Sequence, residues 1–208
     1  MSAWPIGVGE ASLAPTVGVL ALQGAFARHI EVLERCGAKA TEVRQAGQLS
    51  DLDALIIPGG ESTTMVKLMA TFDIVDPLAK LLADGLPVFG TCAGMILLAA
   101  EVTDGHRAPD GSLDQLCLGA IDLVVRRNGY GRQINSFEAD IDIAGLEGPM
   151  TAVFIRAPVV EQAGPEVEVL ALVDGNPVLC RQGPVLVSSF HPELTDDDRL
   201  HHLFVRSL

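Results

Sequence analysis

The sequence is poor in basic residues. It has 14 Lys and Arg against 27 Asp and Glu in 208 residues, for a formal net charge of −13. Because nucleic-acid binding needs cations clustered at phosphates, no nucleic-acid partner is expected. Long hydrophobic runs are also absent, and no basic segment of a secretory signal precedes the apolar stretch 17–22. We therefore expect a globular cytoplasmic protein with no membrane partner.

Cysteine is scarce too, with four residues and no C-x-x-C pair. The cysteine spacing of zinc sites is therefore missing, and we expect no bound metal. The sequence also has no Gly-x-x-x-x-Gly-Lys loop, so we expect no nucleotide cofactor. An acidic chain of this kind is expected to keep its thiols reduced, as in a cytosol. Cys36, Cys117 and Cys180 are interpreted as small residues of the core.

Apolar strands and amphipathic helices alternate in the first half of the chain. This alternation predicts an α/β fold with a mostly parallel central sheet covered on both faces. The predicted strands are 16–22, 39–44, 54–57 and 86–89, and the predicted helices are 26–36, 62–72, 77–83 and 95–102. Residues 1–15 lack periodicity and are expected to form a flexible extension before a single domain, 16–208.

The second half is richer in short strands separated by turn residues, which predicts an antiparallel extension of the sheet. The tetrapeptide Asp174-Gly175-Asn176-Pro177 is a good hairpin signal. A closing helix is expected over 196–208, with Leu200, Leu203, Phe204 and Leu208 on one face. The predicted strands of this half are 118–126, 136–143, 151–155, 167–173, 177–180 and 185–190.

The pentapeptide Gly90-Thr91-Cys92-Ala93-Gly94 lies between a predicted strand and a predicted helix. Two glycines permit a tight turn that exposes the central thiol at the carboxyl end of the sheet. A helix N-terminus favours the thiolate, and the Ala93 N–H is a candidate oxyanion donor. A lone cysteine in this place also fits a structural role in the core.

A second motif, His191-Pro192-Glu193, ends the predicted strand 185–190. Together with Cys92, it supplies a nucleophile, a base and a group that orients the base. Each residue alone has an ordinary structural explanation, but three at the ends of inner strands favour catalysis. A third loop, Pro58 to Ser62, offers backbone N–H groups to a ligand, and Ser62 also fits an N-cap.

These motifs resemble class I, triad-type glutamine amidotransferases and, more narrowly, the glutaminase subunits of pyridoxal 5′-phosphate synthase. The resemblance covers residues 16–208. Its most specific parts are the loop Pro58-Gly59-Gly60-Glu61-Ser62-Thr63-Thr64 and the segment Asn128 to Gln133, beside the segments 20–26, 136–138, 154–158 and 190–193. It implies a flavodoxin-like, three-layer fold. The stretch 106–115 is a variable loop or an insertion relative to that family.

The resemblance implies that Cys92 forms a thioester with glutamine, His191 moves the proton and Glu193 orients His191. It implies an oxyanion hole from Ala93 and the Gly59/Gly60 loop. The residues it assigns to glutamine binding are Gly59, Gly60, Glu61, Ser62, Ala93, Arg127, Ile155 and Arg156. A guanidinium suits the α-carboxylate of the substrate, although Arg127 equally fits a solvated strand end.

The same resemblance implies a partner, a (β/α)₈ synthase subunit that uses the ammonia to make pyridoxal 5′-phosphate in a hetero-oligomeric complex. The first helix, with Arg28 and Glu31, is the expected interface. Alternatives are an amidotransferase of another nitrogen pathway, a stress or chaperone module of related architecture, and an inactive regulatory homologue. The loop at 58–64 argues against the first, and Glu193 argues against the second.

Overall fold

The computed structural model describes residues 14–104, 116–127, 129 and 136–208. Residues 1–13 of the predicted extension 1–15, the variable loop 106–115 and most of the segment 128–133 therefore lie outside the described residues. The helices are α1 (Phe26–Arg35), α2 (Ser62–Thr71), α3 (Val75–Ala83), α4 (Ala93–Leu98) and α5 (Arg199–Val205), with 3₁₀ turns η1 (Ala46–Leu49) and η2 (Pro192–Leu194). The strands are β1 (Thr16–Leu20), β2 (Lys39–Val43), β3 (Ala54–Ile57), β4 (Val88–Thr91), β5 (Ala99–Val102), β6 (Ile121–Arg126), β7 (Ser136–Ile141), β8 (Met150–Ile155), β9 (Val159–Ala163), β10 (Glu168–Val173), β11 (Asn176–Gln182) and β12 (Val185–Ser188).

A seven-stranded sheet runs through the middle of the molecule in the order β10-β11-β12-β4-β3-β1-β2. Strands β2, β1, β3, β4 and β12 are parallel, while β10 and β11 add to β12 as an antiparallel extension. The order 2-1-3-4-5 of the parallel part is that of flavodoxin-like folds. The predicted mixed sheet is confirmed.

The hairpin that joins β10 to β11 follows the predicted turn chemistry. Val173 pairs with Asn176, which leaves Asp174 and Gly175 as a two-residue loop. Both have positive φ, 49° and 80°. This is the backbone that a type I′ turn requires, and Asp-Gly is a favoured pair for it.

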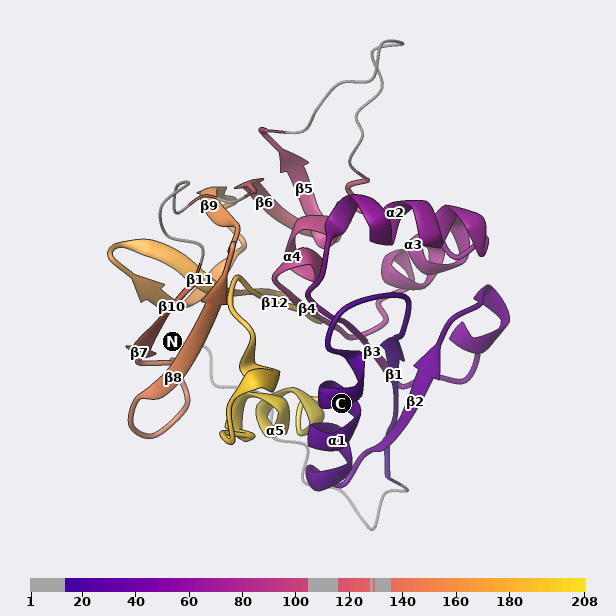
Figure 1. Cartoon of the computed structure of the whole chain (residues 1–208), viewed down its shortest axis with the longest axis horizontal. Coiled ribbons are helices and arrows are strands. Elements are labelled where there is room, and N and C mark those ends of the chain that lie inside the picture. The colour runs from indigo at the N-terminus through magenta and orange to yellow at the C-terminus, as the bar shows by residue number, and fades with distance from the viewer. Residues whose placement is uncertain (1–13, 105–115, 128, 130–135) are drawn as a thin grey trace.

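Helices cover both faces of the sheet (Figure 1): α2, α3 and α4 on one face, α1 and α5 on the other. Alternate residues of each inner strand enter different cores, as the pleat requires. In β3, Leu55 and Ile57 pack with the α2–α4 side, whereas Ala54 and Ile56 pack with the α1–α5 side. Two small sheets, β5-β6-β9 and β7-β8, adjoin this framework.

Three sequence predictions are wrong in detail. The predicted helix 95–102 ends at Leu98, and 99–102 is strand β5, paired with β6. A continuous apolar run does not distinguish a buried helix from a buried strand. Strand β9 was not predicted, since three of its five residues are exposed and two of these, Glu161 and Gln162, are polar. Leu208 lies beyond α5 and is exposed, so it does not continue the buried face of Leu200 and Phe204.

None of the helices in the described ranges is long and apolar enough to cross a membrane.

Candidate active site

Cys92 lies at the junction of β4 and α4 in a strained backbone conformation. Its φ of 49° is in the left-handed region, which a side chain with Cβ rarely adopts. Its N–H donates to Ser188 O at 2.8 Å, and this bond ties the turn to the neighbouring strand β12. A Cβ on Gly94 would overlap the Ile57 carbonyl, so the turn also needs glycine there. Strain of this kind at a cysteine points to function.

His191 and Glu193 follow β12, the strand beside β4. Ser188 pairs with Thr91 in parallel register, which brings the residues after both strands to one edge of the sheet. The His191 N–H donates to Val153 O at 2.9 Å, and the Glu193 Oε1 lies 2.8 Å from His191 Nδ1. Cys92, His191 and Glu193 are only 6%, 9% and 3% exposed. The predicted nucleophile, base and orienter are therefore together and shielded from water.

The electrostatics of this group favour a charged imidazole. Burial opposes the protonation of His191, but hydrogen bonds and charge from Cys92 and Glu193 outweigh it and raise the pKa of His191 to about 10. Burial also disfavours the Glu193 carboxylate, yet His29 and His191 hold the pKa of Glu193 below its usual value. A carboxylate beside an imidazolium fixes the Nδ1–H tautomer of the base.

The loop after β3 packs directly on this group. A Cβ on Gly59 would overlap the ring of His191 and come within 3.2 Å of Cys92 Cβ. The Gly59 N–H donates to Thr91 Oγ1 at 3.0 Å. The missing side chain of Gly59 thus lets the loop lie close to His191 and Cys92, while its N–H is hydrogen-bonded to Thr91, the residue before Cys92.

Glu61, rather than Ser62, is the N-cap of α2. Its carboxylate accepts hydrogen bonds from the N–H groups of Thr63 and Thr64 at 3.0 and 2.7 Å. The Thr64 hydroxyl and these N–H groups lower the pKa of Glu61. The prediction of Ser62 as the cap is wrong by one residue, because a carboxylate one position earlier reaches the same N–H groups. The cap keeps the loop in place beside the thiol.

A cavity of about 250 Å³ opens over Cys92 and His191. Six of the predicted binding residues line it: Gly60, Glu61, Ser62, Arg127, Ile155 and Arg156. The Cys92 Sγ contacts the Ile155 carbonyl at 3.8 Å. The Arg127 side chain is anchored through its Nη2 to the Asp104 carbonyl at 2.9 Å.

Three predicted residues stand behind this cavity: Gly59 and Ala93 pack beside the nucleophile, and Glu193 lies behind His191. Two residues of the lining, Gln23 and Ile96, were not predicted as site residues. Gln23 Oε1 accepts the Glu61 N–H at 3.2 Å and so supports the loop. Its place in the segment 20–26, at the end of a parallel strand, was the signal that could have identified it.

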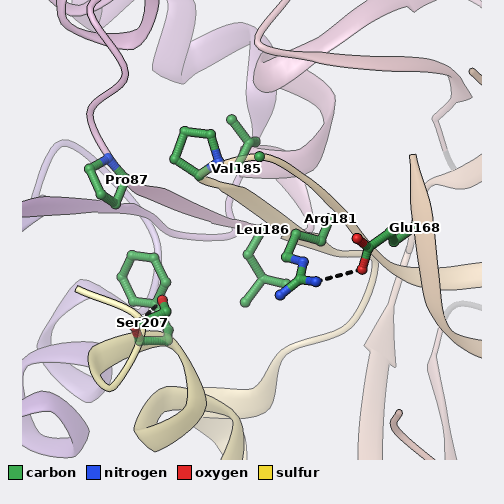
Figure 2. A pocket seen from close by; sticks show the side chains of 9 residues that line it. Pro87, Glu168, Arg181, Val185, Leu186 and Ser207 are labelled. Carbon is green, nitrogen blue, oxygen red and sulfur yellow. Dashed lines mark hydrogen bonds and ion pairs between the residues drawn. The ribbon is translucent and has the colours of Figure 1, made fainter. Parts of the chain in front are cut away.

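A larger cavity, about 330 Å³, lies at the opposite edge of the sheet (Figure 2). It is lined at the start of β4 and β12 by Pro87 and Val185, and the guanidinium of Arg181 in its wall is paired with Glu168 at 2.5 Å. The cavity contains no thiol and no histidine among its lining residues. Of these two cavities, the smaller one is therefore the one that brings a thiol and an imidazole together.

A thiol, an imidazole and a carboxylate aligned in this order define an enzyme of nucleophilic acyl transfer. The chain belongs to the SNO glutamine amidotransferase family, whose model matches residues 19–208. The family predicted from the motifs is thereby confirmed.

Curated relatives agree with this assignment. The chain is 56% identical over 193 residues to "Pyridoxal 5′-phosphate synthase subunit PdxT" of Parafrankia sp. (strain EAN1pec), covering 92% of each chain. It is 54% identical to the subunit of the same name from Mycolicibacterium vanbaalenii, covering 94% of this chain and 98% of the relative.

Solved structures agree as well. A crystal structure described as a glutamine amidotransferase superimposes with a TM-score of 0.82 at 50% identity, covering 92% of this chain and 99% of that one. The structure of PurLQS from Thermotoga maritima superimposes with a TM-score of 0.62 at 16% identity, covering 94% of this chain and 96% of that one. At that identity the second match concerns the fold alone.

Proposed function

We propose that the protein hydrolyses L-glutamine to L-glutamate and ammonia at Cys92 and supplies the ammonia to pyridoxal 5′-phosphate synthesis. The observation that carries this proposal is the strained Cys92 beside the His191–Glu193 pair, in a chain of the SNO glutamine amidotransferase family. The names of the relatives support the pathway. In this proposal residues 16–208 act as one domain and need no metal or organic cofactor.

The reaction runs through a thioester. The Cys92 sulfur attacks the side-chain amide carbon of glutamine, and the imidazolium of His191 gives its proton to the departing ammonia. A water molecule then attacks the thioester carbonyl while His191 accepts its proton, and glutamate leaves as Cys92 is restored. Glu193 holds His191 by the 2.8 Å contact at Nδ1, so that Nε2 faces the thiol.

The tetrahedral intermediates need backbone donors for their oxyanion. The Ala93 N–H, at the start of α4, and the Gly60 N–H, in the loop after β3, are the donors we assign. Gly59 serves the site by its lack of a side chain, since its N–H is engaged by Thr91.

The cavity suits an amino acid with a charged head. Arg156 lies exposed at the rim, and Arg127 forms part of the wall, so guanidinium groups are available to the α-carboxylate. Gly60, Glu61, Ser62 and Ile155 complete the surface against the glutamine side chain.

The proposed partner is a (β/α)₈ synthase subunit that receives the ammonia in a hetero-oligomeric complex in the cytoplasm. Direct transfer has a physical reason, because free ammonia becomes the non-nucleophilic ammonium ion near neutral pH. Helix α1 presents Arg28 and Glu31 on its exposed face, where their side chains pair at 3.3 Å. We place the interface there, and a charge reversal at either residue should weaken complex formation.

Glutamate release from glutamine tests the proposal, measured for the chain alone and with the synthase subunit, and with C92A as control. Release that the synthase stimulates and C92A abolishes is the expected result. Release that ignores the synthase would contradict the pathway, and no release under either condition would contradict the glutaminase.

A further inference from the structure

Two more histidines lie buried directly behind Glu193. His29 is on α1 and His201 is on α5, and neither has any exposed surface. His29 Nε2 lies 3.4 Å from Glu193 Oε2, and His29 Nδ1 lies 2.9 Å from His201 Nε2. Neither ring lines the cavity above Cys92. Cys92, His191, Glu193, His29 and His201 thus form a row of polar side chains that runs from the thiol to helices α1 and α5.

We propose that His29 is a positioning residue, which holds Glu193 and through it the base His191, while His201 fixes the tautomer of His29. The inference rests on the proposed role of Cys92, His191 and Glu193 as the catalytic triad. It assigns a role in catalysis to two residues that never touch the substrate.

The hydrogen-bond roles along this row follow from the chemistry of each group. A carboxylate only accepts, so we assign the N–H of His29 to Nε2, the ring nitrogen that lies 3.4 Å from Glu193 Oε2. Burial lowers the pKa of His29, and burial lowers the pKa of His201 to about 3, so both rings are neutral near pH 7. A neutral ring carries one N–H. His29 Nδ1 is then a lone pair, and His201 must donate to it from Nε2.

The end of the row agrees with this assignment. His201 Nδ1 is left as a lone pair, and it is a buried nitrogen without a hydrogen-bond partner among the described residues. Glu193 Oε2 likewise has no hydrogen-bond partner within the described part of the chain, and His29 Nε2 lies beside it at the ion-pair distance of 3.4 Å. His29 is therefore the group that compensates this carboxylate oxygen. Leaving a buried charge uncompensated is costly.

His29 also reaches the other half of the site. Its Nε2 lies 3.4 Å from Thr91 Oγ1, which accepts the Gly59 N–H at 3.0 Å. One ring thus contacts both the orienting carboxylate and the residue that holds the loop after β3.

The two helices that carry the histidines are fixed to each other at the surface. Arg35, at the end of α1, donates two hydrogen bonds of 2.7 Å to Asp198, the N-cap residue of α5. Paired bonds of this kind add geometric precision as well as energy. The His29–His201 contact is therefore held from outside as well as from within.

The test is the glutaminase kinetics of H29L and H29Q, measured with the synthase subunit present. Leucine fills the space without a donor, whereas the glutamine amide can place N–H near the position of Nε2. We expect H29L to lower kcat about 10- to 100-fold. KM for glutamine should stay within about twofold, because the substrate contacts are intact. H29Q should recover most of the lost kcat.

The matched control is C180A, another fully buried side chain, on β11 and apart from the triad. It should lower the melting temperature by a few degrees, on the order of 1 kcal/mol of stability, and leave kcat unchanged. An unchanged kcat in folded H29L would overturn the proposal. Equal losses in H29L and H29Q, in step with their melting temperatures, would also overturn it by showing a merely structural role.

A second readout separates this inference from the proposed function. If the wild-type chain releases no glutamate, the glutaminase proposal fails, and the rate of Cys92 alkylation by iodoacetamide at pH 7 decides the role of His29. Slower alkylation in H29L, which recovers at higher pH, supports it, and an unchanged rate contradicts it. Should H29L not fold, H201L removes the fixing donor instead, and we expect a several-fold loss of kcat, whose absence contradicts the proposal.

Discussion

The two edges of the central sheet hold cavities of similar size and different chemistry. At the amino ends of β4 and β12, a cavity of about 330 Å³ is lined by the guanidinium of Arg181, which is already paired with Glu168. At the carboxyl ends of the same strands, a cavity of about 250 Å³ is lined by the strained Cys92 and the buried His191. Parallel strands end at one edge, so residues that follow different strands meet there. Topology, rather than cavity volume, therefore favours the carboxyl ends of the strands as the place of the proposed reaction.

The largest loss of activity should come from a change at Glu193, the carboxylate beside His191 at the carboxyl ends of the strands. E193Q keeps the shape of the side chain but removes the charge that stabilises imidazolium and fixes the Nδ1–H tautomer of His191. We expect kcat to fall about 10³- to 10⁴-fold. Steady-state glutaminase kinetics check this, with E166Q as control, because Glu166 is an exposed turn residue. A loss below tenfold would contradict the role of Glu193.

A smaller effect should come from the loop that packs on the triad. G59A introduces a Cβ into the space of the His191 ring, so the ring or the loop must move. We expect about a 10²-fold loss of kcat/KM, as for a displacement of about 1 Å at a reacting group. The control is G47A, where a Cβ meets no atom within 4 Å. Equal activities of the two variants would contradict the close packing.

The smallest effect should come from the opposite edge. E168Q removes the half-exposed partner of Arg181, with an expected loss of about 0–1 kcal/mol in the free energy of unfolding. Its kcat should equal that of the wild type. Chemical denaturation and glutaminase kinetics measure the two quantities. A loss of activity in E168Q would contradict the claim that the cavity at the amino ends of the strands takes no part in the reaction.

The sequence predicts most elements of the framework because their apolar runs are bounded by clear turns. It fails in the run from Met95 to Val102, which contains both a helix and a strand, because its largely apolar sequence has no periodicity that divides them. At the site, the nucleophile, base and orienter are predictable because each lies in a short local motif. His29 and His201 are not, since their contact joins residues 172 positions apart. Only the packing of α1 on α5 brings them together.

Covalent labelling with a diazo-ketone analogue of glutamine tests most directly the claim that Cys92 is a nucleophile in a glutamine pocket. Burial raises the pKa of Cys36 to about 11 and that of Cys180 to about 12, so both remain thiols at pH 8. We predict a single adduct, located by mass spectrometry on Cys92, whose formation glutamine slows. An adduct on another cysteine, or labelling of Cys92 that glutamine does not slow, would contradict the account.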